Sequence, residues 1–274
     1  MTEEKALLAR IAEALERLVP PAPPRAADPL AHPAYVWRDA RLAAVEEFRA
    51  QPLGLLHGID IQKARLLENT RRLARGLPAH DVLLWGARGM GKSSLVSSVV
   101  AHVREDRENL ALVQVPGAAL ATLPQLFALL RGQPRAYVVF GDDLSFEANQ
   151  QAARDLRSLL EGGAEARPAN CRIYITSNRR HLVPRDLAEQ DSAINPRDVV
   201  DDRLALADRF GLSLGFHACS QDEYLAILHG YAEAHGLQVD EHAAIAWTVE
   251  RGARSGRVAW QYFQEMLGAA GRRA

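Results

Sequence analysis

The sequence predicts an α/β fold in which a parallel β-sheet is flanked by helices and followed by a small all-helical unit. Three observations support this prediction. Short apolar runs alternate with helical patterns from Asp81 onward, a glycine-rich loop joins the first run to the next helix, and the strand pattern ends at Phe216. Short apolar strands separated by helices are typical of a parallel sheet that is buried on both faces.

The bulk properties of the chain fit this fold and exclude several classes of protein. Its 274 residues are enough for one core plus a smaller satellite domain, and a formal net charge of -1 gives no global attraction to nucleic acid or acidic membranes. Two cysteines form neither a disulfide framework nor a zinc site of the usual spacing, which favours a reducing compartment. Because no secretory signal or bilayer-spanning apolar segment is recognisable, we expect a cytoplasmic protein with no membrane partner.

The N-terminal part is expected to be helical and to contain a proline-rich linker. Apolar residues recur at helical spacing over residues 7–18, and four prolines follow within residues 20–24. Residues 35–53 are again predicted to be helical. The expected division is an N-terminal segment, a sheet domain and a helical unit, over residues 1–50, 51–218 and 219–274.

Five apolar runs are predicted to be strands of the sheet, with helices between them. The predicted strands cover residues 82–85, 110–115, 137–140, 173–176 and 212–216. Helices are expected around residues 95–103, 123–129 and 152–160. In the C-terminal unit, Ser220 followed by Glu223 forms a capping box that begins a helix, and two more helices are expected over residues 241–249 and 257–267.

The strongest motif is the glycine-rich loop between the first predicted strand and its helix. It matches the pattern G-x-x-x-x-G-K-[ST] and is followed by Ser94; its residues are Gly86, Ala87, Arg88, Gly89, Met90, Gly91, Lys92 and Ser93. Glycines let successive backbone N–H groups point at phosphate oxygens, and the helix N-terminus adds positive charge. Lys92 is expected to contact the β- and γ-phosphates, and the Ser93 hydroxyl to ligate magnesium. The strand–loop–helix context disfavours a turn with no ligand, so the predicted cofactors are ATP and Mg²⁺.

Polar residues follow two of the predicted strands at the sheet edge where ligands collect. Asp142 is the expected magnesium partner, and Asp143 stands where many ATPases carry a glutamate that polarises the attacking water. A turn or a helix cap is the alternative for this pair, and the phosphate loop makes it the weaker one. Asn178 ends the next strand, where it is equally compatible with holding the attacking water and with an ordinary Asx-turn.

Two arginines, Arg209 before Phe210 and Arg257 at the start of the last predicted helix, are further candidates. By themselves they are best interpreted as surface residues of an arginine-rich chain. Their functional interpretation depends on a resemblance to a known family.

The order of these elements resembles that of AAA+ ATPases across about residues 50–270. A phosphate loop, paired acids, a polar strand end, an arginine before a phenylalanine and a helical lid with another arginine follow one another. In finer detail the sequence resembles a bacterial group, domain-of-unknown-function family 815. The matching stretches are LHGID at residues 56–60, GDDLSFE at 141–147, LEGG at 160–163 and TSNRRHL at 176–182.

The resemblance implies a P-loop NTPase domain of the AAA+ type with a C-terminal lid, and it implies roles for several residues. His57, Gly58 and Ile59 would line the adenine pocket, and Asn178 would be the first sensor. Arg209 would be the arginine finger that reaches the ATP of a neighbouring subunit. Arg257 would be the second sensor, with Arg254 as its nearest competitor. An arginine that acts in trans implies a homo-oligomer, with a hexameric ring as the expected form.

The function implied is an ATPase that couples ATP binding and hydrolysis to conformational change in an oligomer, acting on a protein client. Two departures from the family pattern qualify it. Asp143 is one methylene shorter than the usual glutamate, so slow hydrolysis or an ATP-gated scaffold is an alternative. The loop at residues 115–119 lacks the aromatic residue that protein-threading relatives carry. A nucleic-acid remodeller is another alternative, since residues 203–216 resemble replication initiators, although the net charge does not support it.

Overall fold

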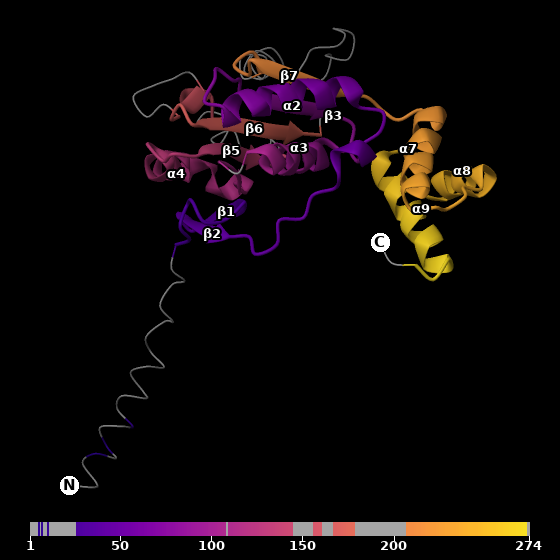
Figure 1. Cartoon of the computed structure of the whole chain (residues 1–274), viewed down its shortest axis with the longest axis horizontal. Helices are drawn as coiled ribbons and strands as arrows, with labels where there is room; N and C mark the ends of the chain where they lie inside the picture. Colours follow the sequence, from indigo (N-terminus) through magenta and orange to yellow (C-terminus); the bar gives the residue numbers. More distant parts are fainter. Residues whose placement is uncertain are drawn as a thin grey trace, which may run out of the picture.

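The computed structural model describes residues 26–107, 109–144, 156–160, 167–178 and 207–272, together with Lys5, Leu7 and Arg10. In this part of the chain a seven-stranded sheet has the order β2-β1-β4-β5-β6-β3-β7 (Figure 1). The strands are β1 (Ala34–Arg38), β2 (Arg41–Ala44), β3 (Val82–Gly86), β4 (Leu110–Gln114), β5 (Ala136–Gly141), β6 (Cys171–Ser177) and β7 (Leu212–Phe216). The strands from β3 to β7 all pair in parallel, which confirms the predicted sheet.

Helices cover both faces of the sheet and form two separate apolar cores. On one face, α2 (Asp60–Ala74) and α3 (Lys92–Asp106) pack against the sheet, and Leu95, Val96 and Val99 of α3 are fully buried. Burial of each such side chain stabilises the fold by about 1.5–3 kcal/mol. The other face is covered by the 3₁₀ helix η2 (Gly117–Thr122), by α4 (Leu123–Leu130) and by helical residues 156–160.

The prediction of a helix over residues 35–53 was wrong, because this segment contains a β-hairpin. Strands β1 and β2 pair antiparallel, with Arg38 opposite Arg41. The two residues between them, Asp39 and Ala40, have φ angles of 52° and 53°, as in the tight turn that joins twisted antiparallel strands. Strand β1 also pairs in parallel with β4. The expected boundary at residue 50 therefore separates two strands from the sheet to which they belong.

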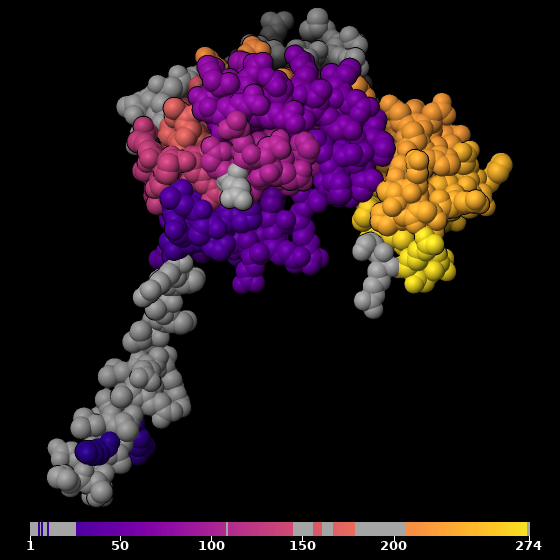
Figure 2. Space-filling model, in the orientation of Figure 1, coloured from indigo at the N-terminus to yellow at the C-terminus, as the bar shows by residue number. Residues whose placement is uncertain are grey.

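The C-terminal helices form a lobe of their own beside the sheet domain (Figure 2). They are α7 (Gln221–Ala234), α8 (Glu241–Glu250) and α9 (Gly256–Ala269). The predicted capping box is present: the Glu223 backbone N–H donates to Ser220 Oγ over 3.1 Å, and the Ser220 backbone N–H donates to Glu223 Oε2 over 2.7 Å. A third apolar cluster packs α7 against α9, and its fully buried members include Tyr224, Leu228 and Phe263.

Two sequence predictions fall largely outside the described residues. They are the amphipathic helix with its proline-rich linker at residues 7–24 and the first half of the helix at residues 152–160. Within the described ranges, every helix is too short or too polar to span a bilayer.

Candidate functional site

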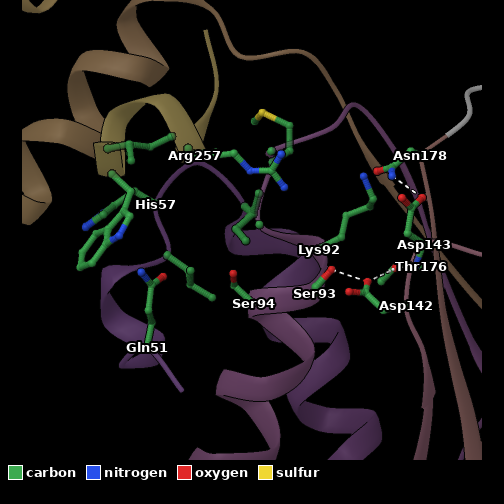
Figure 3. Close-up of a pocket in the computed structure, with 18 of the residues that line it drawn as sticks. Gln51, His57, Lys92, Ser93, Ser94, Asp142, Asp143, Thr176, Asn178 and Arg257 are labelled. Carbon is green, nitrogen blue, oxygen red and sulfur yellow. Dashed lines mark hydrogen bonds between the residues drawn. The ribbon is translucent and has the colours of Figure 1, made fainter. Parts of the chain in front are cut away.

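A cavity of about 310 Å³ lies between the carboxyl ends of the central strands and the C-terminal lobe (Figure 3). It is lined by the glycine-rich loop, the ends of β5 and β6, the segment before α2, and helices α7 and α9. The predicted site residues that line it are His57, Ile59, Gly89, Met90, Gly91, Lys92, Ser93, Ser94, Asp142, Asp143, Asn178 and Arg257. Gly58, Gly86, Ala87, Arg88 and Arg209 are not part of the lining.

Two glycines give the loop its path between β3 and α3. Gly86 has φ 127°, and a Cβ at this position would lie 2.0 Å from the carbonyl oxygen of Phe216 in β7. The next residue, Ala87, donates its backbone N–H to that same oxygen over 3.0 Å. Gly91 caps α3 with φ 81°, a left-handed conformation that favours glycine. The loop thus turns sharply and presents the N-terminus of α3 to the cavity, where the helix dipole favours an anion.

Lys92 lies at the bottom of this loop and is only 5% exposed. Its Nζ donates to the carbonyl oxygens of Gly86 and Ala87 over 2.9 and 2.7 Å. Burial lowers the pKa of Lys92 to about 8, even though Asp143 and Asp142 act in the opposite direction, and Arg88 and Arg257 lower it further. The charges of Arg88 and Arg257 are thus close enough to act on Lys92, and an anion bound beside Lys92 would favour its charged form.

Three oxygen-bearing side chains meet beside the loop. Ser93 Oγ donates to Asp142 Oδ1 over 2.5 Å, and Thr176 Oγ1 donates to the same oxygen over 2.6 Å. A hydroxyl and a carboxylate at this spacing fit Mg²⁺, which prefers oxygen ligands and is held by one or two protein groups plus phosphates. In the described ranges no cluster of three or more His, Cys, Asp or Glu side chains could hold a metal by itself. The donor set thus suits a metal that arrives with a phosphate ligand.

Asp143 is held in an unusual conformation at the end of β5. Its φ is 48°, and its backbone N–H donates to Thr176 Oγ1 over 2.7 Å. A left-handed conformation at a residue other than glycine costs about 1–3 kcal/mol, and outside tight turns such residues cluster at functional sites. The side chain is held too, because Asn178 Nδ2 donates to Asp143 Oδ1 (Figure 3). Asn178 therefore contacts the Asp143 carboxylate directly and restricts its rotation.

The C-terminal lobe contributes Arg257 and a direct backbone contact. The Arg257 N–H donates to the carbonyl oxygen of Gly89 over 3.0 Å, and Figure 3 shows the Arg257 side chain on the cavity side, facing the glycine-rich loop. Arg254, the predicted competitor, is exposed and does not line the cavity. Of the two arginines, only Arg257 lines the cavity.

The far end of the cavity is apolar and aromatic. It is lined by Ile59 from the segment before α2, by Ile227 and Tyr231 of α7 and by Trp260 of α9. His57 also lines this end; its Nε2 is buried, has no hydrogen-bond partner among the described residues, and lies against α7. Aromatic and aliphatic walls with a few polar atoms suit a flat heterocycle such as a nucleobase.

Sequence reasoning missed Thr176 as a site residue, although it lies in the segment predicted to end at Asn178. Its hydroxyl joins Asp142 to the backbone of Asp143. A hydroxyl residue near the end of an otherwise apolar strand was the available signal. Arg209 is exposed at the residue before buried Phe210 and does not line the cavity of its own chain.

Comparison with known proteins agrees with the fold described above. The family described as Protein of unknown function (DUF815) matches residues 30–270. No curated protein matched the chain. The fold is similar to that of the Thermotoga maritima RuvB Holliday junction branch migration motor, with 19% identity over 82% of this chain and 68% of that one and a TM-score of 0.51.

A second solved structure with a similar fold is the Aeropyrum pernix ORC1 protein in complex with DNA. Its identity to this chain is 16%, over 84% of this chain and 67% of that one, with a TM-score of 0.56. At these identities the likeness concerns the fold, which is that of an AAA+ P-loop NTPase with a helical C-terminal lobe. Since the family match covers most of the sequence, this chain belongs to the DUF815 family.

Proposed function

We propose that this chain binds ATP with magnesium and hydrolyses it to ADP and phosphate. The observation that supports this most is that Lys92 and Ser93, at the start of α3, lie beside Asp142, which follows β5, at one end of the cavity. The aromatic far end of the cavity suits the adenine ring, and the loop suits the triphosphate. The apolar and the charged ends of the cavity thus match the base and the triphosphate of the nucleotide.

Binding would use charges that the fold already holds in place. Lys92 Nζ bonds two neutral carbonyl oxygens, and phosphate oxygens in their place would form stronger, charge-assisted hydrogen bonds. Ser93 and Asp142 would hold magnesium, which neutralises charge between the β- and γ-phosphates when bound. Arg257 would approach the γ-phosphate from the lid.

In the hydrolytic step, the Asp143 carboxylate would accept a proton from water. The water oxygen forms a bond to the γ-phosphorus, and the bond from that phosphorus to the β–γ bridging oxygen breaks, so that ADP leaves with the electron pair. Asn178 would orient the carboxylate through its hydrogen bond to Oδ1. Positioning and charge stabilisation of this kind are the main contributions that a protein makes to phosphoryl transfer.

The proposal includes assembly of the chain into a homo-oligomer. Arg209 is exposed and does not line the cavity of its own subunit. A contact between this arginine and a γ-phosphate would therefore be made across a subunit interface, as in the arginine-finger arrangement. A ring such as a hexamer would give each site one arginine from a neighbour. The client would be a protein that the ring remodels.

Steady-state ATPase assays test the proposal. We expect phosphate release that falls at least a hundredfold in Lys92→Ala, which removes the charge at the phosphates, and also falls in Arg209→Ala. The Arg209→Ala variant should still bind ATP, because its own cavity is intact. Activity that is unchanged in Lys92→Ala would contradict the proposal.

An ATP-gated scaffold with little turnover is the second candidate. It is favoured by Asp143, whose side chain is short and is held by Asn178. Single-turnover rates of the wild type and of Asp143→Glu distinguish the two candidates. A scaffold predicts a very slow wild type that is accelerated by the longer side chain, whereas brisk turnover with no gain from the substitution favours the ATPase.

A further inference from the structure

Arg88 belongs to the glycine-rich loop, but no step of the proposed function uses its side chain. It lies at the third position of the loop, is not part of the cavity lining, and its side chain is 75% exposed. Its Nη2 lies 3.9 Å from Oδ2 of Asp143, whose side chain is 54% exposed. An ion pair therefore connects the glycine-rich loop to the carboxylate at the end of β5.

The two oxygens of Asp143 thus have different partners from different elements. Oδ1 accepts a hydrogen bond from Asn178 at the end of β6, and Oδ2 is paired with Arg88 of the loop. The backbone of Asp143 is fixed as well, through Thr176 Oγ1. The Asn178 hydrogen bond holds Oδ1, and the longer ion pair to Arg88 attracts Oδ2 and so biases the rotation of the carboxylate about χ2.

We propose that Arg88 is a positioning residue that sets the orientation of the Asp143 carboxylate toward the attacking water. The inference rests on the proposed ATPase and adds a part to it. Asp143 is shorter than the glutamate usual at this position, so an off-axis rotation moves its oxygens out of reach of a water more readily. In the proposed complex the glycine-rich loop holds the γ-phosphate. An arginine on the same loop would therefore keep the short carboxylate turned toward a water beside that phosphate.

The size of the expected effect follows from the exposure of the pair. Ion pairs between exposed side chains are weak, and loss of this one should slow hydrolysis by about two- to fivefold. Since Arg88 acts through Asp143 in this account, its loss should leave the affinity for ATP unchanged. A direct contact between Arg88 and the phosphates would instead weaken the binding of ATP more than that of ADP.

The test compares Arg88→Gln and Arg88→Lys with the wild type in the full chain. Equilibrium binding of ATP and ADP with magnesium is measured beside the single-turnover rate. We expect unchanged affinities, a two- to fivefold slower rate in Arg88→Gln, and partial recovery in Arg88→Lys, which keeps the charge. Arg65→Gln, which removes an exposed arginine from α2, controls for the change in net charge and should match the wild type.

A double-mutant cycle with Asp143→Asn identifies the residue through which Arg88 acts. We expect Arg88→Gln to have no further effect on the residual rate in the Asp143→Asn background, because coupled residues are not additive. Equal rates of Arg88→Gln and wild type would overturn the proposal. So would an additive effect, or a selective loss of ATP affinity. Absence of nucleotide binding by the wild type would instead refute the proposed function itself.

Discussion

The backbone N–H of Arg257 donates a 3.0 Å hydrogen bond to the carbonyl oxygen of Gly89, and so joins the first turn of α9 to the middle of the glycine-rich loop. Ser255, which caps α9, lies against the same glycine. A movement of the C-terminal lobe would therefore break a contact with the loop that we propose binds the triphosphate. The position of the lobe and the shape of the loop are coupled through these three residues.

The first prediction concerns Gly89→Ala. Gly89 has φ 75°, and a Cβ would lie 2.8 Å from Ser255 Oγ and 3.3 Å from Arg257 Cβ. We expect the variant to push the lobe away from the loop and to weaken ATP binding by about tenfold, the loss of one good hydrogen bond. Titration calorimetry measures the affinity.

Gly132→Ala is the matched control for this variant. Gly132 also has φ 75°, but a Cβ there meets nothing within 4 Å. Both variants should therefore lose the same stability to backbone strain, about 1 kcal/mol or somewhat more. Only Gly89→Ala should lose affinity for ATP. Equal affinities in the two variants would show that the contact between lobe and loop is irrelevant to binding.

A second prediction uses Gly230→Ala to test the apolar, aromatic end of the cavity, where we propose that the adenine base binds. A Cβ on Gly230 of α7 would lie 2.1 Å from Nε2 of His57, so the imidazole must move. We expect weaker binding of ATP and of ADP alike, because both carry the base. Gly268→Ala in α9 is the control, since a Cβ there meets nothing within 4 Å and alanine favours a helix by up to about 1 kcal/mol. It should raise the Tm and bind ATP as the wild type does.

The pKa of Lys92 gives a third prediction. Because burial lowers this pKa to about 8, the ammonium is present below that pH and is lost as the pH rises through it. Because the charged form is the one that we propose binds phosphate, the affinity for ATP should fall by up to tenfold per pH unit above about pH 8. The last ionisation of a phosphate group has a pKa of about 6, so the ligand no longer changes charge above about pH 8. Calorimetry from pH 7 to 9.5 measures the effect, and Lys92→Ala should show weak binding without this trend.

The sheet and its loop could be predicted because their signals are local. Short apolar runs predict the parallel strands, which are five to seven residues long, and the capping box at Ser220 predicts the start of α7. The phosphate-loop motif places Lys92 and Ser93 relative to β3 without any long-range information. These predictions agree with the structure to within one or two residues.

The hairpin and the contacts between strands could not be predicted in the same way. The turn at Asp39–Ala40 lacks the glycine that usually marks such a turn, so the segment gave no strong hairpin signal. The role of Thr176 depends on β6 lying beside β5, and strand order is a long-range property. The pairing of Arg88 with Asp143 depends likewise on β5 lying near the loop after β3.

The most direct test of the account is a calorimetric titration of the full chain with ATP, with magnesium and with a chelator in its place. We predict one ATP bound per chain, more tightly with magnesium than without it. In Asp142→Asn, which has the shape of the wild type and can still accept from Ser93 and Thr176, magnesium should no longer strengthen binding. A folded wild-type chain that shows no binding of ATP in the presence of magnesium would contradict the account.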